Sequence, residues 1–187
     1  MGVWLGPKVG LGSGLREFAS RTPGAWETVR KGILPGTLVG LAIGAVALLG
    51  ASSMPENALI PGWKNPTILE GLLRCLSAAL TEEIAFRFGL MTFLAWVVWL
   101  GLRRPATHAT PLWVGNLLAA LLFAAAHLPG QPPEAWNPGL LVPMLTFNAA
   151  AGMIMGWLFM RYGLISAIGA HFVADVVQVV GWAALAG

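Results

Sequence analysis

The chain has 187 residues, of which 57% are hydrophobic and only 10% are charged, and its mean hydropathy is +0.73. Soluble domains carry about a quarter charged residues, so this chain has too few polar side chains to cover a soluble globular protein. The net charge of +3 is small and spread along the chain, which argues against a nucleic-acid partner. The composition therefore predicts one integral membrane domain, and the single cysteine, Cys75, excludes an internal disulfide framework.

The first 31 residues mix basic, acidic and apolar side chains. We expect residues 1–31 to be an N-terminal surface segment, either a loop followed by a short amphipathic helix on the membrane or a disordered tail. Residues 32–187 are then the membrane-embedded domain. Its first span is predicted at 33–53, about the 20 residues that a bilayer core requires.

Glycines at every fourth position mark two of the predicted helices: Gly36, Gly40 and Gly44, and then Gly152 and Gly156. Small residues at this spacing make a flat helix face on which a neighbouring helix can pack closely. We expect such faces to serve helix packing and to offer a docking surface for a partner membrane protein.

The next apolar stretch, 67–102, would measure about 50 Å as one straight helix, longer than a bilayer core of about 30 Å. We therefore predict an interfacial or re-entrant half-helix at 67–78 and a full span at 79–102. Three further spans are predicted at 111–128, 139–160 and 163–186. The expected fold is all-α: a polytopic transmembrane bundle of about five full spans plus a half-helix.

Ionisable side chains inside these stretches are informative, because burying each in hydrocarbon costs about 3 kcal/mol or more. They are Glu70, Arg74, Glu82, Glu83, Arg87, His127, His171 and Asp175. Structural pairing among them is the simplest explanation, and Glu83 can pair with Arg87 because the two lie four residues apart on one helix face. Glu82 is rotated by about 100° from Glu83 and has no such cation, which suits a general base.

Three short motifs follow one another in separate apolar helices. Residues 82–87 (EEIAFR) match EExxxR, residues 123–127 (FAAAH) match FxxxH, and residues 171–175 (HFVAD) match HxxxN/D. In this order they resemble the CPBP family (CAAX protease and bacteriocin-processing, also called Abi). The resemblance covers about residues 66–180, the CPBP-like catalytic core.

The resemblance implies a glutamic-type intramembrane endopeptidase that acts on a membrane-associated protein or peptide without a cofactor or metal. It implies that Glu82 activates water with the help of His127, and that His171 and Asp175 stabilise the oxyanion. Supporting roles fall to Glu83, Arg87 and Phe123. Amide hydrolysis needs such an activated water on one side of the carbonyl and donors on the other.

Asp175 departs from the family pattern, in which Asn is common at this position. An ionised Asp only accepts hydrogen bonds, so Asp175 would either orient His171 and favour its imidazolium form or carry a proton itself.

The predicted topology sets the depth of these side chains. We expect Glu82 near the start of its span and His127 near the end of the next, so that both lie at one membrane face. His171 is expected deeper, about 12 Å from the opposite face. If residues 67–78 are re-entrant, the arginines at that opposite face predict that this face is cytoplasmic. If residues 67–78 instead complete a crossing of the membrane, the N-terminus moves to the other side, and the sidedness stays open.

Three alternatives stay open at this point. Glu82, His127, His171 and Asp175 are plausible zinc ligands, although no HExxH motif is present. A non-catalytic membrane scaffold, a bacteriocin-immunity protein or a subunit of a larger complex is the second, and the full set of motif residues argues against it. A proton or ion transporter is the third, disfavoured because no inverted repeat is found. The short chain, rich in Ala and Gly, leads us to expect a bacterial inner-membrane location.

Overall fold

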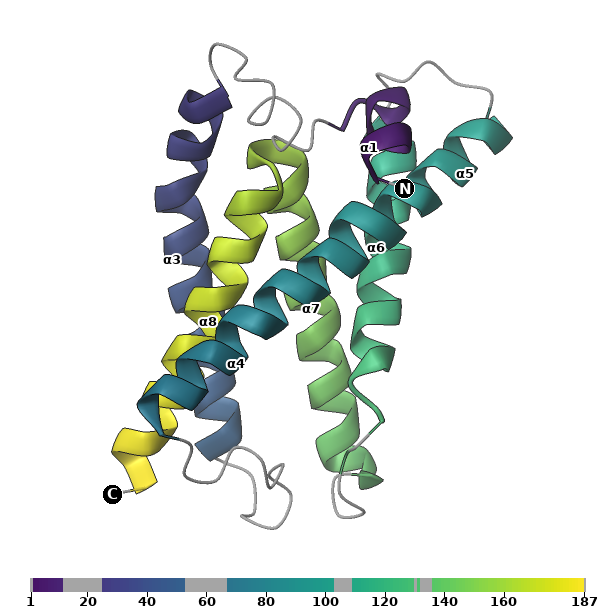
Figure 1. Cartoon of the computed structure of the whole chain (residues 1–187). Helices are drawn as coiled ribbons and strands as arrows, with labels where there is room; N and C mark the ends of the chain where they lie inside the picture. Colours follow the sequence, from purple (N-terminus) through teal and green to yellow (C-terminus); the bar gives the residue numbers. More distant parts are fainter. Residues whose placement is uncertain are drawn as a thin grey trace.

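The computed structural model describes residues 2–11, 25–52, 67–102, 109–129, 131 and 136–186, and every regular element among them is helical. The elements are α1 (Gly2–Leu5), η1 (Gly6–Val9), α3 (Ala25–Ser52), α4 (Ile68–Glu82), η4 (Glu83–Met91), α5 (Thr92–Leu102), α6 (Ala109–Ala126), α7 (Pro138–Tyr162) and α8 (Leu164–Ala186). Five helical runs in the described residues are long and apolar enough to cross a membrane, which confirms the predicted all-α polytopic bundle. Figure 1 shows them side by side, with successive runs pointing in opposite directions.

The first span begins earlier than predicted. Helix α3 runs without a break from Ala25, so the amphipathic turns expected at the end of the surface segment are its first turns. Lys31 and Glu27, four residues apart there, form an exposed ion pair of 2.8 Å. Residues 12–24 of the predicted surface segment lie outside the described residues.

The predicted half-helix at 67–78 is joined to the span that follows it. Elements α4, η4 and α5 form one helical run from Ile68 to Leu102. Thr67 and Glu70 start this run with a reciprocal capping box, and no proline interrupts it afterwards. At about 1.5 Å per residue its 35 residues exceed a bilayer core, and Figure 1 shows the run crossing the bundle obliquely, which shortens its projection.

The middle of this run, η4, is a π-helix. Buried residues recur at every fourth position along the whole run: Gly71, Cys75, Ala79, Glu83, Arg87, Met91 and Ala95. Residues four apart are separated by slightly more than one turn of an α-helix, which has 3.6 residues per turn, and by slightly less than one turn of the wider π-helix. The stripe of buried residues therefore drifts around the helix axis in opposite directions in the α and π segments. The π segment therefore keeps one face of a long helix toward the bundle.

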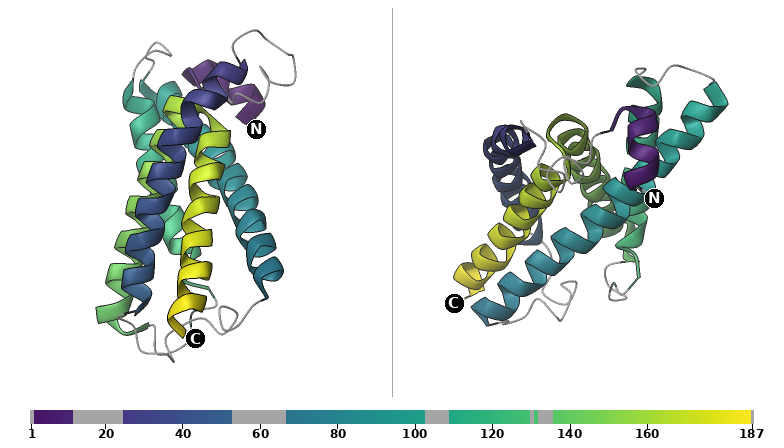
Figure 2. Two further views of the ribbon diagram at one scale, coloured as in Figure 1. Left: turned by 90° about the vertical axis from the view of Figure 1, so that its left-hand side faces the viewer. Right: turned by 45° about the horizontal axis from the view of Figure 1, so that its top comes forward.

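The glycine faces are used inside the chain. Gly32, Gly36, Gly40 and Gly44 of α3 all pack on α8. A Cβ atom at Gly36 would lie 2.9 Å from the Ser166 carbonyl oxygen, and one at Gly40 would meet the carbonyl of Ala170. Figure 2 shows α3 and α8 running side by side. This close approach, which only glycine permits, lets the Ser166 hydroxyl donate a 3.0 Å hydrogen bond to the Gly32 carbonyl.

Helix α7 uses its glycines in the same way. A Cβ atom at Gly152 would lie 3.1 Å from Ala120 of α6, and one at Gly156 would meet the Asn116 side chain. Asn116 is fully buried and donates from Nδ2 to the Met153 carbonyl at 2.9 Å. Both glycine stripes thus hold helices of this chain together.

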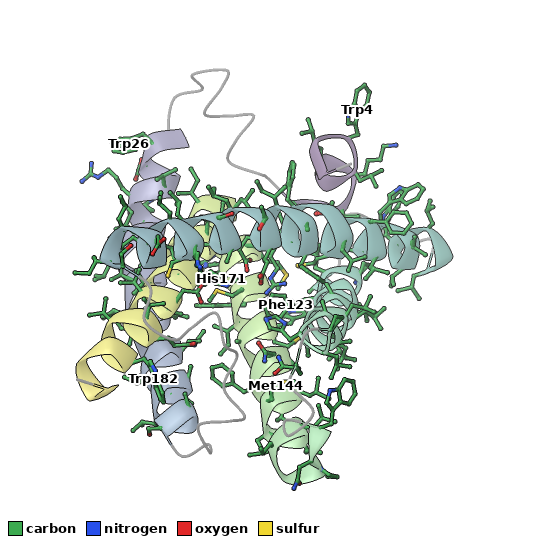
Figure 3. All side chains as sticks on the ribbon, turned by 60° about the horizontal axis from the view of Figure 1, so that its bottom comes forward. Trp4, Trp26, Phe123, Met144, His171 and Trp182 are labelled. Carbon is green, nitrogen blue, oxygen red and sulfur yellow. The ribbon has the colours of Figure 1, made fainter. Side chains whose placement is uncertain are left out.

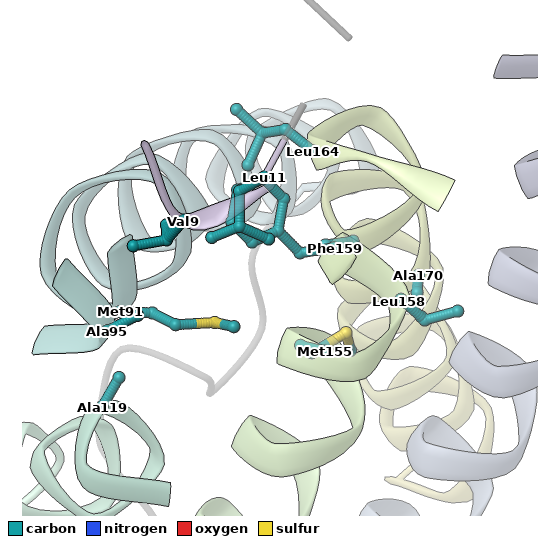
Figure 4. Packing of buried hydrophobic residues seen from close by; sticks show 11 residues of the cluster. Val9, Leu11, Met91, Ala95, Ala119, Met155, Leu158, Phe159, Leu164 and Ala170 are labelled. Atoms are coloured by element: carbon teal, nitrogen blue, oxygen red, sulfur yellow. The ribbon is translucent and has the colours of Figure 1, made fainter. Parts of the chain in front are cut away.

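Residues 2–11, expected on the surface, pack into one end of the bundle, and we call them the N-terminal hook. Val9 and Leu11 are 1% and 4% exposed and belong to the main hydrophobic core cluster (Figure 4). Gly10 between them has φ 77°, a left-handed turn that glycine adopts readily. These two apolar side chains fill space between α5, α7 and α8, so this part of the predicted surface segment is anchored in the core.

Candidate active site

The three motifs come from three separate parts of the bundle. EExxxR spans the junction of α4 and η4, FxxxH lies at the end of α6, and HxxxD lies in the first half of α8. Figure 3 shows His171 and Phe123 facing the middle of the bundle beneath the long α4–η4–α5 run. The fold therefore gathers side chains that are far apart in the sequence.

Glu83 is at the centre of this cluster. Its side chain is fully buried, and its Oε1 atom accepts a 2.9 Å hydrogen bond from Nδ1 of His171. Its other oxygen, Oε2, lies 3.2 Å from Nε of Arg87, which is the ion pair expected from their spacing. One buried carboxylate thus connects η4 to α8.

The second ring nitrogen of His171 faces two further carboxylates. Nε2 lies 3.6 Å from Oδ2 of Asp175 and 3.9 Å from Oε2 of Glu82. Asp175 therefore faces Nε2, whereas the Nδ1 atom of His171 is held by Glu83. The exposed fraction of the side chains rises from 0% for Glu83 to 11% for His171, 18% for Asp175 and 32% for Glu82.

Arg87 is fully buried, and its Nη atoms have no hydrogen-bond acceptor among the described residues. Its guanidinium carbon lies 4.6 Å from the centre of the Phe123 ring. A cation over an aromatic face is attracted by the negative charge of the ring face, most strongly where water is excluded. Glu83 and Phe123 together compensate a charge that an apolar span would otherwise disfavour.

Phe123 also contacts the aromatic rings around it. Its ring centre lies 4.7 Å from that of His127, 5.2 Å from that of Phe86 and 6.2 Å from that of His171, all in edge-to-face arrangements. The phenylalanine of FxxxH is thus the packing link between the two histidines.

His127 follows the last residue of α6 and is oriented by its own helix. Its Nδ1–H donates a 2.8 Å hydrogen bond to the Phe123 carbonyl, which leaves Nε2 as an acceptor in the neutral ring. Gln131 donates from Nε2 to the His127 carbonyl at 2.8 Å. No hydrogen bond or ion pair joins His127 to Glu82 among the described residues, and the Phe123 ring lies edge-to-face with the rings of both His127 and His171.

The depth of Glu82 differs from the expectation. Because residues 67–78 belong to the same helical run, Glu82 lies about 21 Å along it from Ile68 and not at its start. His171 follows Leu164, the first residue of α8, by two turns. Glu82 and His171 therefore meet within the bundle without the offset predicted from the sequence.

A tertiary contact of Glu83 is what sequence reasoning missed. Helical spacing pairs Glu83 with Arg87, but its hydrogen bond to His171 joins residues 88 positions apart. Thr92 was also missed: it is fully buried and donates from Oγ1 to the Arg87 carbonyl at 3.2 Å. No spacing rule for an α-helix signals this bond, which spans the five-residue step of the π segment.

No three His, Cys, Asp or Glu side chains among the described residues are placed to hold one metal ion.

The fold and the site define a class of protein: an integral, multi-pass helical membrane protein with a buried acid–base cluster between its helices. The chain belongs to the Rce1-like family, whose model is described as type II CAAX prenyl endopeptidase Rce1-like, because this model matches residues 64–177, more than half of the chain. The matched segment contains all three motifs, and the result confirms the resemblance to the CPBP family. No curated protein and no solved structure gives a significant match.

Proposed function

We propose that this protein is a glutamic-type intramembrane endopeptidase that hydrolyses a peptide bond of a membrane-associated protein or peptide. Membership of a family of CAAX prenyl endopeptidases supports the protease class. The observation that carries the assignment of roles is the difference between two adjacent carboxylates: Glu82 is one-third exposed, whereas Glu83 is fully buried and already paired. Only Glu82 is free to meet a water molecule and a substrate.

In the proposed reaction, Glu82 removes a proton from water, and the oxygen attacks the carbonyl carbon of the scissile peptide bond. His127, whose Nε2 is an acceptor, holds the same water once substrate is present. The resulting tetrahedral oxyanion is stabilised by a donor on Nε2 of the His171 imidazolium and by Asp175. The proton on Glu82 then passes to the leaving nitrogen as the carbon–nitrogen bond breaks.

Asp175 fits this role through its position. It shares the Nε2 side of His171 with Glu82, so it faces the same region as the proposed base. A protonated Asp175 would donate to the oxyanion, and an ionised one would favour the imidazolium form of His171.

The test is cleavage of a membrane-anchored peptide library by the purified protein in detergent, comparing the wild type with Glu82→Gln. Glu70→Gln is the matched control, because Glu70 lies on the same helix, is exposed, and its capping role is one that Gln can fill. We expect Glu82→Gln to lose at least 100-fold in kcat, about the contribution of a general base, and Glu70→Gln to keep the wild-type rate. Equal cleavage by the wild type and Glu82→Gln would refute the role of Glu82.

The same assay carries two further arms. A chelator should leave cleavage unchanged. Loss of cleavage on chelation would instead indicate that Glu82, His127 and His171 are metal ligands. Peptides with and without a C-terminal prenyl group test whether the substrate implied by the family description applies to this chain. No cleavage of any peptide, together with full biological function of Glu82→Gln in its host, would favour the scaffold or immunity alternative.

A further inference from the structure

We infer that Glu83 is a positioning residue for His171, and that it fixes which ring nitrogen of His171 faces the substrate. This inference rests on the proposed protease function for its catalytic meaning, but the contact itself can be tested separately. The supporting observation is the 2.9 Å bond from Nδ1 of His171 to Oε1 of Glu83, between two buried side chains.

The bond places a proton on Nδ1 of His171, whether the ring is neutral or is the imidazolium of the proposed mechanism. An ionised carboxylate only accepts, so the Nδ1 atom of His171 must carry the proton in this hydrogen bond. Nε2 is then the atom turned toward Glu82 and Asp175, the two more exposed carboxylates. A carboxylate that holds one ring nitrogen of a histidine while the other nitrogen acts on the substrate is a recurring arrangement in hydrolases.

Glu83 is itself held in place from the other side. Its Oε2 atom lies 3.2 Å from Nε of Arg87, and Arg87 lies on the Phe123 ring. Arg87, Glu83 and His171 thus form a chain in which each polar group orients the next. Because all three are buried, water does not compete for these contacts.

The geometry of the helix explains why adjacent glutamates take different positions. Glu82 is the last residue of α4 and Glu83 the first of η4, so the change of helix type falls between them. Glu83 lies on the stripe of buried residues that faces the bundle, and Glu82 is turned aside from that stripe. One residue is therefore directed at the histidine and the other at the space next to it.

A simple structural role for Glu83 makes a different prediction from a positioning role. If Glu83 only neutralises Arg87, then removing both charges should restore both the melting temperature and kcat. The double variant Glu83→Leu with Arg87→Met removes the pair and leaves no buried charge behind, so it should fold like the wild type. If Glu83 positions His171, the double variant should still have a low kcat.

We therefore measure kcat, KM and thermal unfolding for four proteins: the wild type, Glu83→Gln, Glu83→Leu, and the double variant Glu83→Leu with Arg87→Met. We expect Glu83→Gln, which keeps an acceptor for Nδ1–H, to lose less than Glu83→Leu. The double variant should recover the wild-type melting temperature but keep a kcat reduced by about 10–100-fold with unchanged KM. Recovery of both stability and kcat would overturn the inference.

A spectroscopic readout separates this inference from the proposed function. The chain has three histidines, so ¹⁵N-labelled histidine gives few ring signals, and His171→Gln identifies those of His171. We expect the wild-type His171 ring to be protonated at Nδ1, and this signature to be lost in the double variant. An unchanged signature in the double variant would refute the positioning role even if no cleavage assay succeeds.

Discussion

The guanidinium group of Arg87 lies on the face of the Phe123 ring, with 4.6 Å between the guanidinium carbon and the ring centre. Phe123 comes from α6 and Arg87 from η4, so this contact joins two of the three motifs without a hydrogen bond. The third motif joins through the edge of the same ring, because His171 lies 6.2 Å from it. A single phenylalanine therefore connects the arginine and both histidines of the cluster.

Replacing Phe123 with Leu should keep the packing apolar but remove the aromatic face. We expect the free energy of unfolding to fall by about 0.5–2 kcal/mol, the range for a buried cation–π contact, and kcat to fall as Arg87 and His171 lose their common support. Denaturant titration in detergent measures the first and peptide cleavage the second. Leu122→Ala, an exposed neighbour on the same helix, should change neither.

The α3–α8 contact should tolerate no side chain at Gly40. A Cβ atom there would meet the carbonyl of Ala170 and lie 2.8 Å from Cβ of Val173, so Gly40→Val must push the helices apart. We expect a loss of about 1–3 kcal/mol in the free energy of unfolding, measured by denaturant titration. Gly50→Val is the matched control, since nothing lies within 4 Å of its Cβ position. Equal melting of the two variants would contradict the close packing.

The N-terminal hook should contribute to stability like a core segment. Leu11 is 4% exposed, and Leu11→Ala should lower the free energy of unfolding by about 2–5 kcal/mol, the range for a buried leucine. Val3→Ala in the same hook removes an exposed side chain and should have little effect. If both variants unfold like the wild type, the hook does not pack as described.

The basic residues predict the orientation in the membrane. Lys31 lies near the start of α3 and Arg161 near the turn between α7 and α8. Figure 1 shows the start of α3 and this turn at the same end of the bundle. Arg103 and Arg104 directly follow α5 in the sequence. By the positive-inside rule we predict that this end is cytoplasmic. In a Cys75→Ser background, a membrane-impermeant maleimide applied to intact cells should label Ser52→Cys at the other end of α3 and leave Lys31→Cys unlabelled until the membrane is opened. If only Lys31→Cys is labelled in intact cells, the protein has the opposite orientation in the membrane.

The spans and the motif residues could be predicted from the sequence, because both depend on local patterns. Apolar runs of bilayer length indicate helices whatever their neighbours, and the predicted spans agree with α3, α6, α7 and α8 to within a few residues at most ends. Spacing also identified the Glu83–Arg87 pair, since positions four apart lie on one helix face.

The remaining features depend on tertiary contacts, which spacing does not encode. A 35-residue run looked too long for one helix because tilt is set by packing against other helices. The burial of Val9 and Leu11 had no local signal, because neither residue belongs to an apolar run long enough to span a membrane. The bond between Glu83 and His171 could not be found either, as it depends on how α8 packs on η4.

The position of the hook has a consequence for how the chain matures during synthesis. Val9 and Leu11 are synthesised before α7 and α8, yet their neighbours in the core include Phe159 and Leu164 from these two helices. Helix α3 likewise enters the membrane before α8, the helix on which its glycine face packs. The hook and α3 must therefore wait for α7 and α8 before they can pack, and contacts between segments so far apart in the sequence form slowly. Until α7 and α8 are inserted, the hook and the glycine face of α3 lack the surfaces that they cover in the finished bundle.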